Sequence, residues 1–94
     1  MSKTIVKSSG NVFIDLGYSS DEAAILQMRA DLTANLRKFI KARKLTQTKA
    51  AELLGISQSR VSDLIRGKWE RFSLEMLISL ATKAGMRITL KTAA

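Results

Sequence analysis

Residues 45–68 read LTQTKAAELLGISQSRVSDLIRGK, and this stretch decides the fold. Thr46 and Ser57 each precede a short run of helix-forming residues, and their hydroxyls can cap the free N–H groups of a helix start. Gly55 and Gly67 follow the two runs. Glycine readily adopts the left-handed conformation that ends a helix, so we expect each helix to stop there. The pattern predicts two short helices, over residues 47–54 and 58–66, joined by a tight turn.

The two helices can cross steeply only where small side chains meet, and Ala50 and Ala51 supply them. We expect apolar side chains to fill the wedge between the helices: Leu54, Ile56, Val61 and Leu64. This packing leaves the other side of the second helix facing solvent.

That solvent side carries small polar side chains that can approach base edges in the major groove of DNA. The candidate base readers are Gln58, Ser59, Ser62 and Asp63. Each has a simpler interpretation, since Ser59 and Ser62 are acceptable at any exposed helix position. Asp63 would repel phosphate, and it can instead pair with Arg66 three residues later.

Basic and amide side chains next to these positions are candidates for phosphate contacts. Arg60, Arg66 and Lys68 lie beside the base readers in sequence. Gln47 lies in the first turn of the first helix, where its amide and the free backbone N–H groups can hold one phosphate. Lys49 would add charge to the same contact.

Composition agrees with a polyanionic partner. The 94 residues include 16 Lys and Arg against 8 Asp and Glu, a net charge of +8. Nucleic acid is the first candidate partner, an anionic membrane surface is the second, and a basic surface without a function is the alternative. A chain of this length has one core, and 46% hydrophobic residues without Pro predict a folded, mostly helical domain.

The residue types that are missing exclude several function classes. The chain has no Cys and no His, which excludes disulfides, thiolate or imidazole zinc sites and His-based or Cys-based catalysis. The carboxylates are scattered, so we expect neither an enzyme, nor a metal site, nor a cofactor. No signal peptide and no run of eighteen apolar residues occur, so we expect no membrane span and a cytoplasmic location.

A longer helix is predicted before the central stretch. Ser19 and Glu22 have the spacing of a capping box, and Asp21 suits the positive end of a helix. Apolar residues then recur at helical spacing as far as Arg43: Ile25, Met28, Leu32, Leu36, Phe39 and Ile40. Thr33 and Asn35 leave open a break in the middle. The stripe is either core throughout or partly a partner interface.

After the central stretch the sequence predicts one more helix and a strand. Ser73 caps the helix, and Gly85 ends it. Leu74, Leu77, Ile78 and Ala81 form its apolar face. Trp69 and Phe72 are expected to plug the space before this helix rather than to stack on bases.

Met86, Ile88 and Leu90 alternate with polar residues, which is typical of a strand with one buried face. A strand needs a partner strand for its backbone hydrogen bonds. The candidates are Val12–Ile14 of the same chain and the same segment of a second chain across a two-fold axis. We favour pairing with the second chain, because a dimer sets two recognition helices about 34 Å apart on a palindrome.

The first eighteen residues are expected to form an arm with two β-compatible patches, Thr4–Val6 and Val12–Ile14. The predicted fold is therefore a mostly α, four- to five-helix bundle with an arm at 1–18, a domain at 19–94 with its core in 32–84, and one C-terminal β-strand.

The central stretch resembles the helix-turn-helix of the Cro and phage-repressor superfamily, the XRE family, over residues 32–84. The matching residues are Leu-Thr-Gln at 45–47, Ala51, Leu-Gly-Ile-Ser at 54–57, Val-Ser at 61–62 and Arg-Gly-Lys at 66–68. The resemblance implies a λ-repressor-like fold that binds double-stranded DNA, with Gln47 on a phosphate and Gln58, Ser59, Ser62 and Asp63 facing bases.

Two residues depart from the family pattern. Leu53 stands where a charged residue is common, and Ala50 stands where Leu is common. We interpret them to mean that extra apolar surface, from the N-terminal helix or from a partner, covers the first helix of the motif.

Three short segments that flank the motif are similar to those of small HigA-type antitoxins. They are Asn-Val-Phe at 11–13, Asp-Leu-Gly at 15–17 and Arg-Phe-Ser-Leu at 71–74. That resemblance implies a dimeric transcriptional repressor that also binds a RelE-like ribonuclease toxin. The alternative is an interaction protein whose main role is to neutralise the toxin, with DNA binding secondary. In that case the arm at 1–18 is needed for neutralisation.

Overall fold

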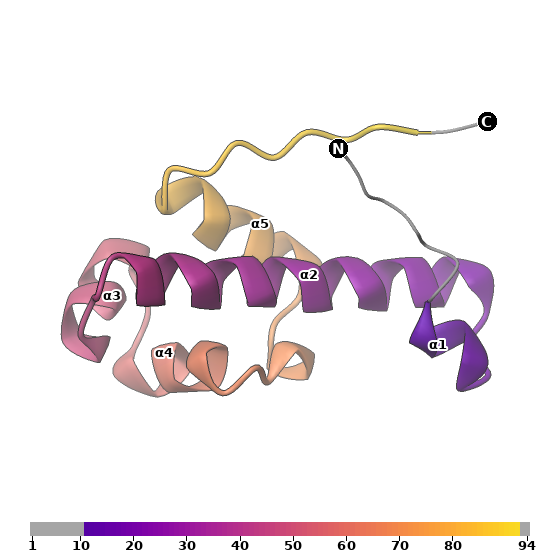
Figure 1. Ribbon diagram of the computed structural model, residues 1–94, viewed down its shortest axis with the longest axis horizontal. Helices are drawn as coiled ribbons and strands as arrows, with labels where there is room; N and C mark the ends of the chain where they lie inside the picture. Colours follow the sequence, from indigo (N-terminus) through magenta and orange to yellow (C-terminus); the bar gives the residue numbers. More distant parts are fainter. Residues whose placement is uncertain (1–10, 93–94) are drawn as a thin grey trace.

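One long helix, α2 (Ser20–Ala42), runs the length of the protein, and the other elements pack around it (Figure 1). The computed structural model describes residues 11–92. The remaining elements are α1 (Val12–Asp15), α3 (Gln47–Leu54), α4 (Gln58–Ile65), the 3-10 helix η2 (Trp69–Arg71) and α5 (Leu74–Lys83). Figure 1 shows α1 at one end of α2 and α3 at the other, with α5 above α2 and α4 below it in this view. The predicted mostly helical fold is confirmed.

Helix α2 is continuous, and its start is the predicted capping box. The backbone N–H of Glu22 donates to Ser19 Oγ at 3.4 Å, and the Ser19 N–H donates to Glu22 Oε1 at 3.3 Å. No break occurs at Thr33, whose hydroxyl donates to the carbonyl of Arg29 one turn earlier at 2.9 Å. Its hydroxyl is thereby satisfied inside the protein, and the helix continues.

The apolar stripe of α2 divides into two parts. Leu36 and Ile40, near its C-terminal end, are buried among α3, α4 and α5. Ile25 and Met28, near its N-terminal end, remain 49% and 43% exposed. The stripe is therefore core in one half and open surface in the other, because α3 to α5 together cover only part of a helix of 23 residues.

The apolar face of α5 is displaced from the predicted one. Leu77 and Ala81 are buried as expected, and Leu80 is buried with them. Ile78 is 38% exposed. The helix therefore presents a face rotated by part of a turn, and with this face it packs mainly against α2.

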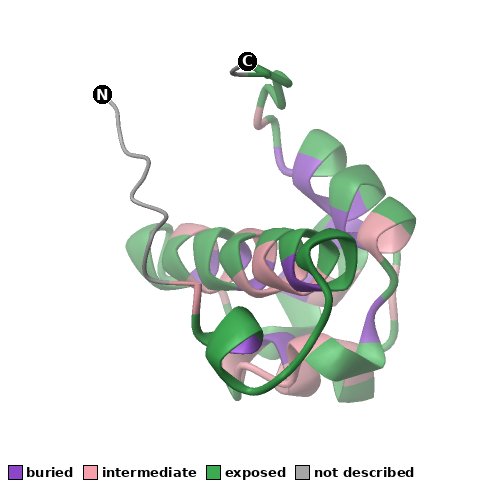
Figure 2. Cartoon of the chain, turned by 90° about the vertical axis from the view of Figure 1, so that its right-hand side faces the viewer, coloured by how far each residue is buried: buried purple, intermediate pink, exposed green. Residues whose placement is uncertain are grey.

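The prediction of a β-compatible patch at Val12–Ile14 was wrong, because these residues form α1. The side chain of Asn11 accepts from the N–H of Phe13 at 2.9 Å and caps the helix. Its amide also donates to the carbonyl of Ala23 on α2 at 3.2 Å, and Phe13 is buried. Contacts with α2 thus decide the local structure, and Figure 2 shows the opposite side of α1 exposed. The patch Thr4–Val6 lies outside the described residues.

The predicted C-terminal β-strand is absent from the described residues. Residues 86–92 form no regular element, and the N–H of Met86 bonds back to the carbonyl of Ala81 at 3.0 Å. A strand needs a backbone partner, and the intrachain candidate Val12–Ile14 is a helix. Within this one chain, the alternation of apolar and polar residues therefore produces no strand.

Candidate nucleic-acid interface

The two helices predicted from the central stretch, α3 and α4, pack against each other across a tight turn. Ala50 lies at the crossing and is fully buried, as are Leu54, Val61 and Leu64 in the wedge. Gly55 adopts a left-handed φ of 69°, which a residue with a Cβ takes only under strain. The buried wedge holds α4 so that its polar side faces solvent.

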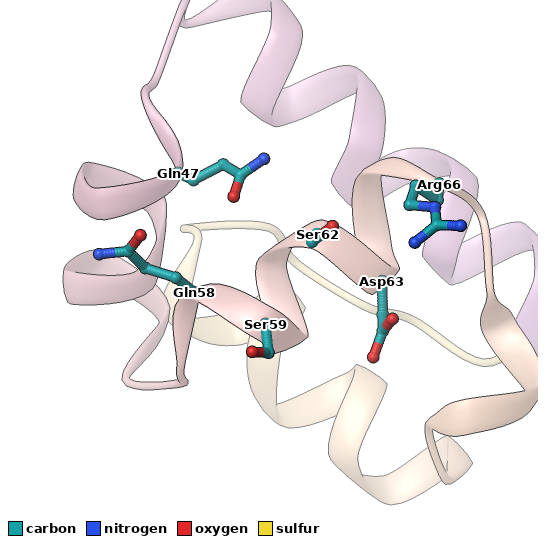
Figure 3. Close-up of a pocket in the computed structure, with 6 residues that line it drawn as sticks. All are labelled: Gln47, Gln58, Ser59, Ser62, Asp63 and Arg66. Atoms are coloured by element: carbon teal, nitrogen blue, oxygen red, sulfur yellow. The ribbon is translucent and has the colours of Figure 1, made fainter.

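Six of the nine residues predicted to contact DNA line one open pocket of about 380 Å³ on this side (Figure 3). They comprise all four candidate base readers and two candidate phosphate contacts: Gln47, Gln58, Ser59, Ser62, Asp63 and Arg66. Gln47 comes from the start of α3, and the others come from α4 and its C-cap. The tertiary structure thus joins residues from both helices in one polar surface.

The six side chains are available to a ligand. Within residues 11–92, none of them hydrogen-bonds to another protein group; the neighbouring caps use Thr46 and Ser57 instead. Gln58 and Ser59 are exposed, while Ser62 and Asp63 are half-buried. Amide, hydroxyl, carboxylate and guanidinium groups on one face provide both donors and acceptors, which is what base edges and phosphates require.

The other three predicted residues lie outside this pocket. Lys49 is exposed on α3, and Lys68 is half-buried just before η2. Arg60 is turned towards η2, where its Nη1 donates to the carbonyl of Arg71 at 2.9 Å. Its guanidinium carbon also lies 5.4 Å from the centre of the Phe72 ring. The phosphate roles of Lys49, Arg60 and Lys68 stay predictions.

The element after α4 has no counterpart in the predictions. Phe72 is buried in the core, as expected of a plug, but Trp69 lies half-buried between α1 and α2. Nε of Arg29 donates to the carbonyl of Phe72 at 2.8 Å, and Nη2 donates to that of Glu70 at 3.1 Å. Arg29 therefore fixes η2 and with it the end of α4. Sequence has no signal for this contact, because the partners are more than forty residues apart.

Across residues 11–92, no three His, Cys, Asp or Glu side chains come together as potential ligands of a metal ion. In the same part of the chain, no helix has the length and apolar character needed to cross a membrane.

Comparison with known proteins points to the same motif. The family described as a helix-turn-helix domain matches residues 12–93, nearly the whole chain. No curated protein matches the sequence. The family match includes α1 as well as the two helices of the motif.

Proposed function

The chain belongs to a helix-turn-helix domain family, and from that membership we propose that it is a sequence-specific, dimeric transcriptional repressor of the antitoxin type. The observation that carries the proposal is the pocket in which four candidate base readers and two candidate phosphate contacts come together. DNA binding follows from the family. Repression, dimerisation and the antitoxin role are the proposed part.

In this function α4 enters the major groove as the recognition helix. Gln58 is suited to a bidentate contact with adenine, and Asp63 can accept from the amino group of cytosine. Ser59 and Ser62 are short enough to let the helix approach the base pairs closely. Gln47 and Arg66, at opposite ends of the pocket, hold the phosphate backbone and set the register.

An apolar groove supports dimerisation. It has a volume of about 540 Å³ and lies between α2, α5 and the C-terminal residues. Its apolar lining is Met28, Leu32, Leu74, Ile78, Ile88 and Leu90. Leu90 is 80% exposed. Beyond Met86, the backbone of the described chain as far as residue 92 makes no hydrogen bond to another backbone group. A second copy, related by a two-fold axis, would pair this segment and cover the groove.

The antitoxin role comes from the resemblance of the flanking segments to HigA-type proteins, and it implies a toxin as protein partner. Exposed apolar side chains at the end of the molecule that carries α1, Leu16 and Tyr18 among them, favour a protein partner of some kind. The second candidate function is therefore a binding protein that mainly neutralises this partner and binds DNA only secondarily.

The test is a gel-shift series with the promoter that lies upstream of the protein's own gene. We expect binding at least about a thousandfold tighter than to random DNA at 0.15 M salt, with affinity falling steeply as salt rises. The dimer predicts protection of two half-sites about one helical turn apart. Equal affinity for the promoter and for random DNA would contradict the specific repressor and leave a non-specific binder.

A further inference from the structure

The end of the protein that carries α1 differs in charge from the rest. Residues 11–28 contain three acidic side chains, Asp15, Asp21 and Glu22, and no Lys or Arg, in a chain of net charge +8. This segment lies at the end of α2 opposite to α3 (Figure 1). Because DNA repels carboxylates, the acidic end is unsuited to a nucleic acid.

Large apolar side chains are exposed at the same end. Their exposed fractions are 52% for Val12, 51% for Ile14, 69% for Leu16, 46% for Tyr18 and 49% for Ile25. We call Leu16, Tyr18 and Ile25 of this group, together with the acidic Asp15 and Glu22, the α1 surface. Tyr18 lines two adjoining hollows, one with Leu16 and one with Glu22, Ile25 and Leu26, so the apolar and acidic groups are contiguous there. Contiguous exposed apolar area with a polar rim is typical of a protein interface.

Packing against the rest of the protein holds α1 in place. The Phe13 ring lies edge-on to Trp69, with 5.3 Å between ring centres, and edge-on to Tyr18, with 6.2 Å. Asn11 joins the start of α1 to the carbonyl of Ala23. A partner therefore meets a preformed surface and does not have to order it, which lowers the cost of binding.

We propose that the α1 surface docks a protein partner that presents an apolar anchor rimmed by Lys and Arg. The apolar side chains supply the buried centre, and Asp15 with Glu22 complements the basic rim. The inference deepens the proposed function, on which it rests, by assigning the protein partner to the end of the molecule away from the recognition helix. DNA and this partner then bind at separate sites.

The probe is a cationic amphipathic peptide of about fourteen Leu and Lys residues, titrated into the ¹⁵N-labelled full-length chain at 0.15 M salt. At this ionic strength the distant basic residues are largely screened. We expect amide shifts confined to residues 12–28, and no binding of the same peptide with Glu in place of Lys. Shifts centred on the groove at 86–92 or on α4, or equal binding of both peptides, would overturn the proposal.

Substitutions in the α1 surface test whether these side chains bind the peptide. Leu16→Ser with Ile25→Ser should weaken peptide binding roughly tenfold or more, and Asp15→Lys should weaken it as well. Leu53→Ser, which changes an exposed leucine on α3, is the matched control and should bind like the wild type. If a chain without residues 1–10 gains peptide affinity and shows the same 12–28 shifts without peptide, the chain's own N-terminal segment is the occupant, and the proposal fails.

Promoter binding, measured on the same variants, distinguishes a failure of the repressor proposal from a failure of the proposed docking surface. All three α1-surface changes should leave DNA affinity within about twofold of the wild type, because none of the changed residues lines the pocket formed by α3 and α4. If the wild-type chain binds the peptide at 12–28 but does not prefer its promoter, the repressor proposal fails and the docking surface stands. The reverse result rejects only the docking surface.

Discussion

The guanidinium carbon of Arg29 lies 5.3 Å from the centre of the Trp69 ring, so one side chain of α2 faces η2, the element that follows α4. The same guanidinium donates to the carbonyls of Phe72 and Glu70. Phe13 packs on Trp69 as well. The position of α4 therefore depends on contacts made outside the helix-turn-helix.

Replacing Arg29 by Ala should destabilise the protein by about 2 kcal/mol, because two charge-assisted hydrogen bonds are lost and the carbonyls need new partners. Urea unfolding monitored by circular dichroism measures the change. Arg29→Lys is the matched control: it keeps the charge but cannot reach both carbonyls as a planar fork, so its loss should be intermediate. A stable Arg29→Ala variant would show that η2 is held by its apolar contacts alone.

Gln58→Ala and Arg66→Ala should affect DNA binding in different ways. Loss of Gln58 should remove preference at one base pair, worth about 1–3 kcal/mol, and leave the salt dependence unchanged. Loss of Arg66 should weaken all sequences alike and reduce the salt slope by about one. Gel shifts with single-base operator variants at several salt concentrations measure both. Identical behaviour of the two variants would refute the division into base and phosphate contacts.

Arg60 should matter more for stability than for DNA affinity. Its Nη1 donates to the Arg71 carbonyl, and the guanidinium packs over Phe72, so Arg60→Ala should cost about 1 kcal/mol of unfolding free energy. The salt slope of DNA binding should change less than in Arg66→Ala. A stable Arg60→Ala variant with a clearly shallower slope would restore Arg60 as a phosphate contact.

Leu90→Lys should convert the proposed dimer into a monomer. A charge on the most exposed apolar side chain of the groove cannot be buried against a second copy without a large desolvation cost. Sedimentation equilibrium measures the mass, and palindrome binding should weaken while half-site binding is retained. Thr48→Lys, which adds a charge at another exposed position of α3, is the control for oligomeric state. A dimeric Leu90→Lys variant would move the interface elsewhere.

The start of α2 should make stability depend on acid pH. The Ser19 hydroxyl lies 2.7 Å from Asp21 Oδ1, and this hydrogen bond, with those of the backbone N–H groups at the helix start, lowers the pKa of Asp21. A pKa lowered by folding contributes stability above the unfolded pKa, near 3.8, and this contribution is lost as pH falls through the folded pKa.

The variant Asp21→Asn lacks this titration. Thermal unfolding between about pH 5 and pH 2 should therefore show a smaller loss of stability on acidification than in the wild type. The comparison is made as a difference between the two proteins, because the other carboxylates titrate in both. Equal pH dependence would mean that the cap stabilises charged and neutral Asp21 alike.

Local chemistry explains the parts of the fold that the sequence predicted well. A serine or threonine hydroxyl caps each of the four helices α2 to α5, and each of these caps accepts from a backbone N–H three residues later. Gly55 is left-handed at the end of α3. These signals act over a few residues, so they can be read without knowing the tertiary structure.

The polar face of α4 was predictable for a related reason. Helical periodicity places Ser59, Ser62 and Asp63 on one side, and the buried Val61 and Leu64 on the other. What the sequence could not predict is that Arg60 would turn away from this face. Its partner is the backbone carbonyl of Arg71, which reaches Arg60 only because η2 folds back beside α4.

By itself, then, the sequence determined the start of α2, the helices α3 to α5, the N-caps and the composition of the candidate DNA-binding face, because capping and periodicity are short-range properties. It left the continuity of α2 past Thr33 open. Only the tertiary structure decided that Val12–Ile14 is helical, that the stripe of α2 is buried in one half alone, and that residues 86–92 have no strand partner in the described chain. These outcomes depend on which surfaces meet. A short apolar segment adopts the backbone that its neighbours can cover and hydrogen-bond.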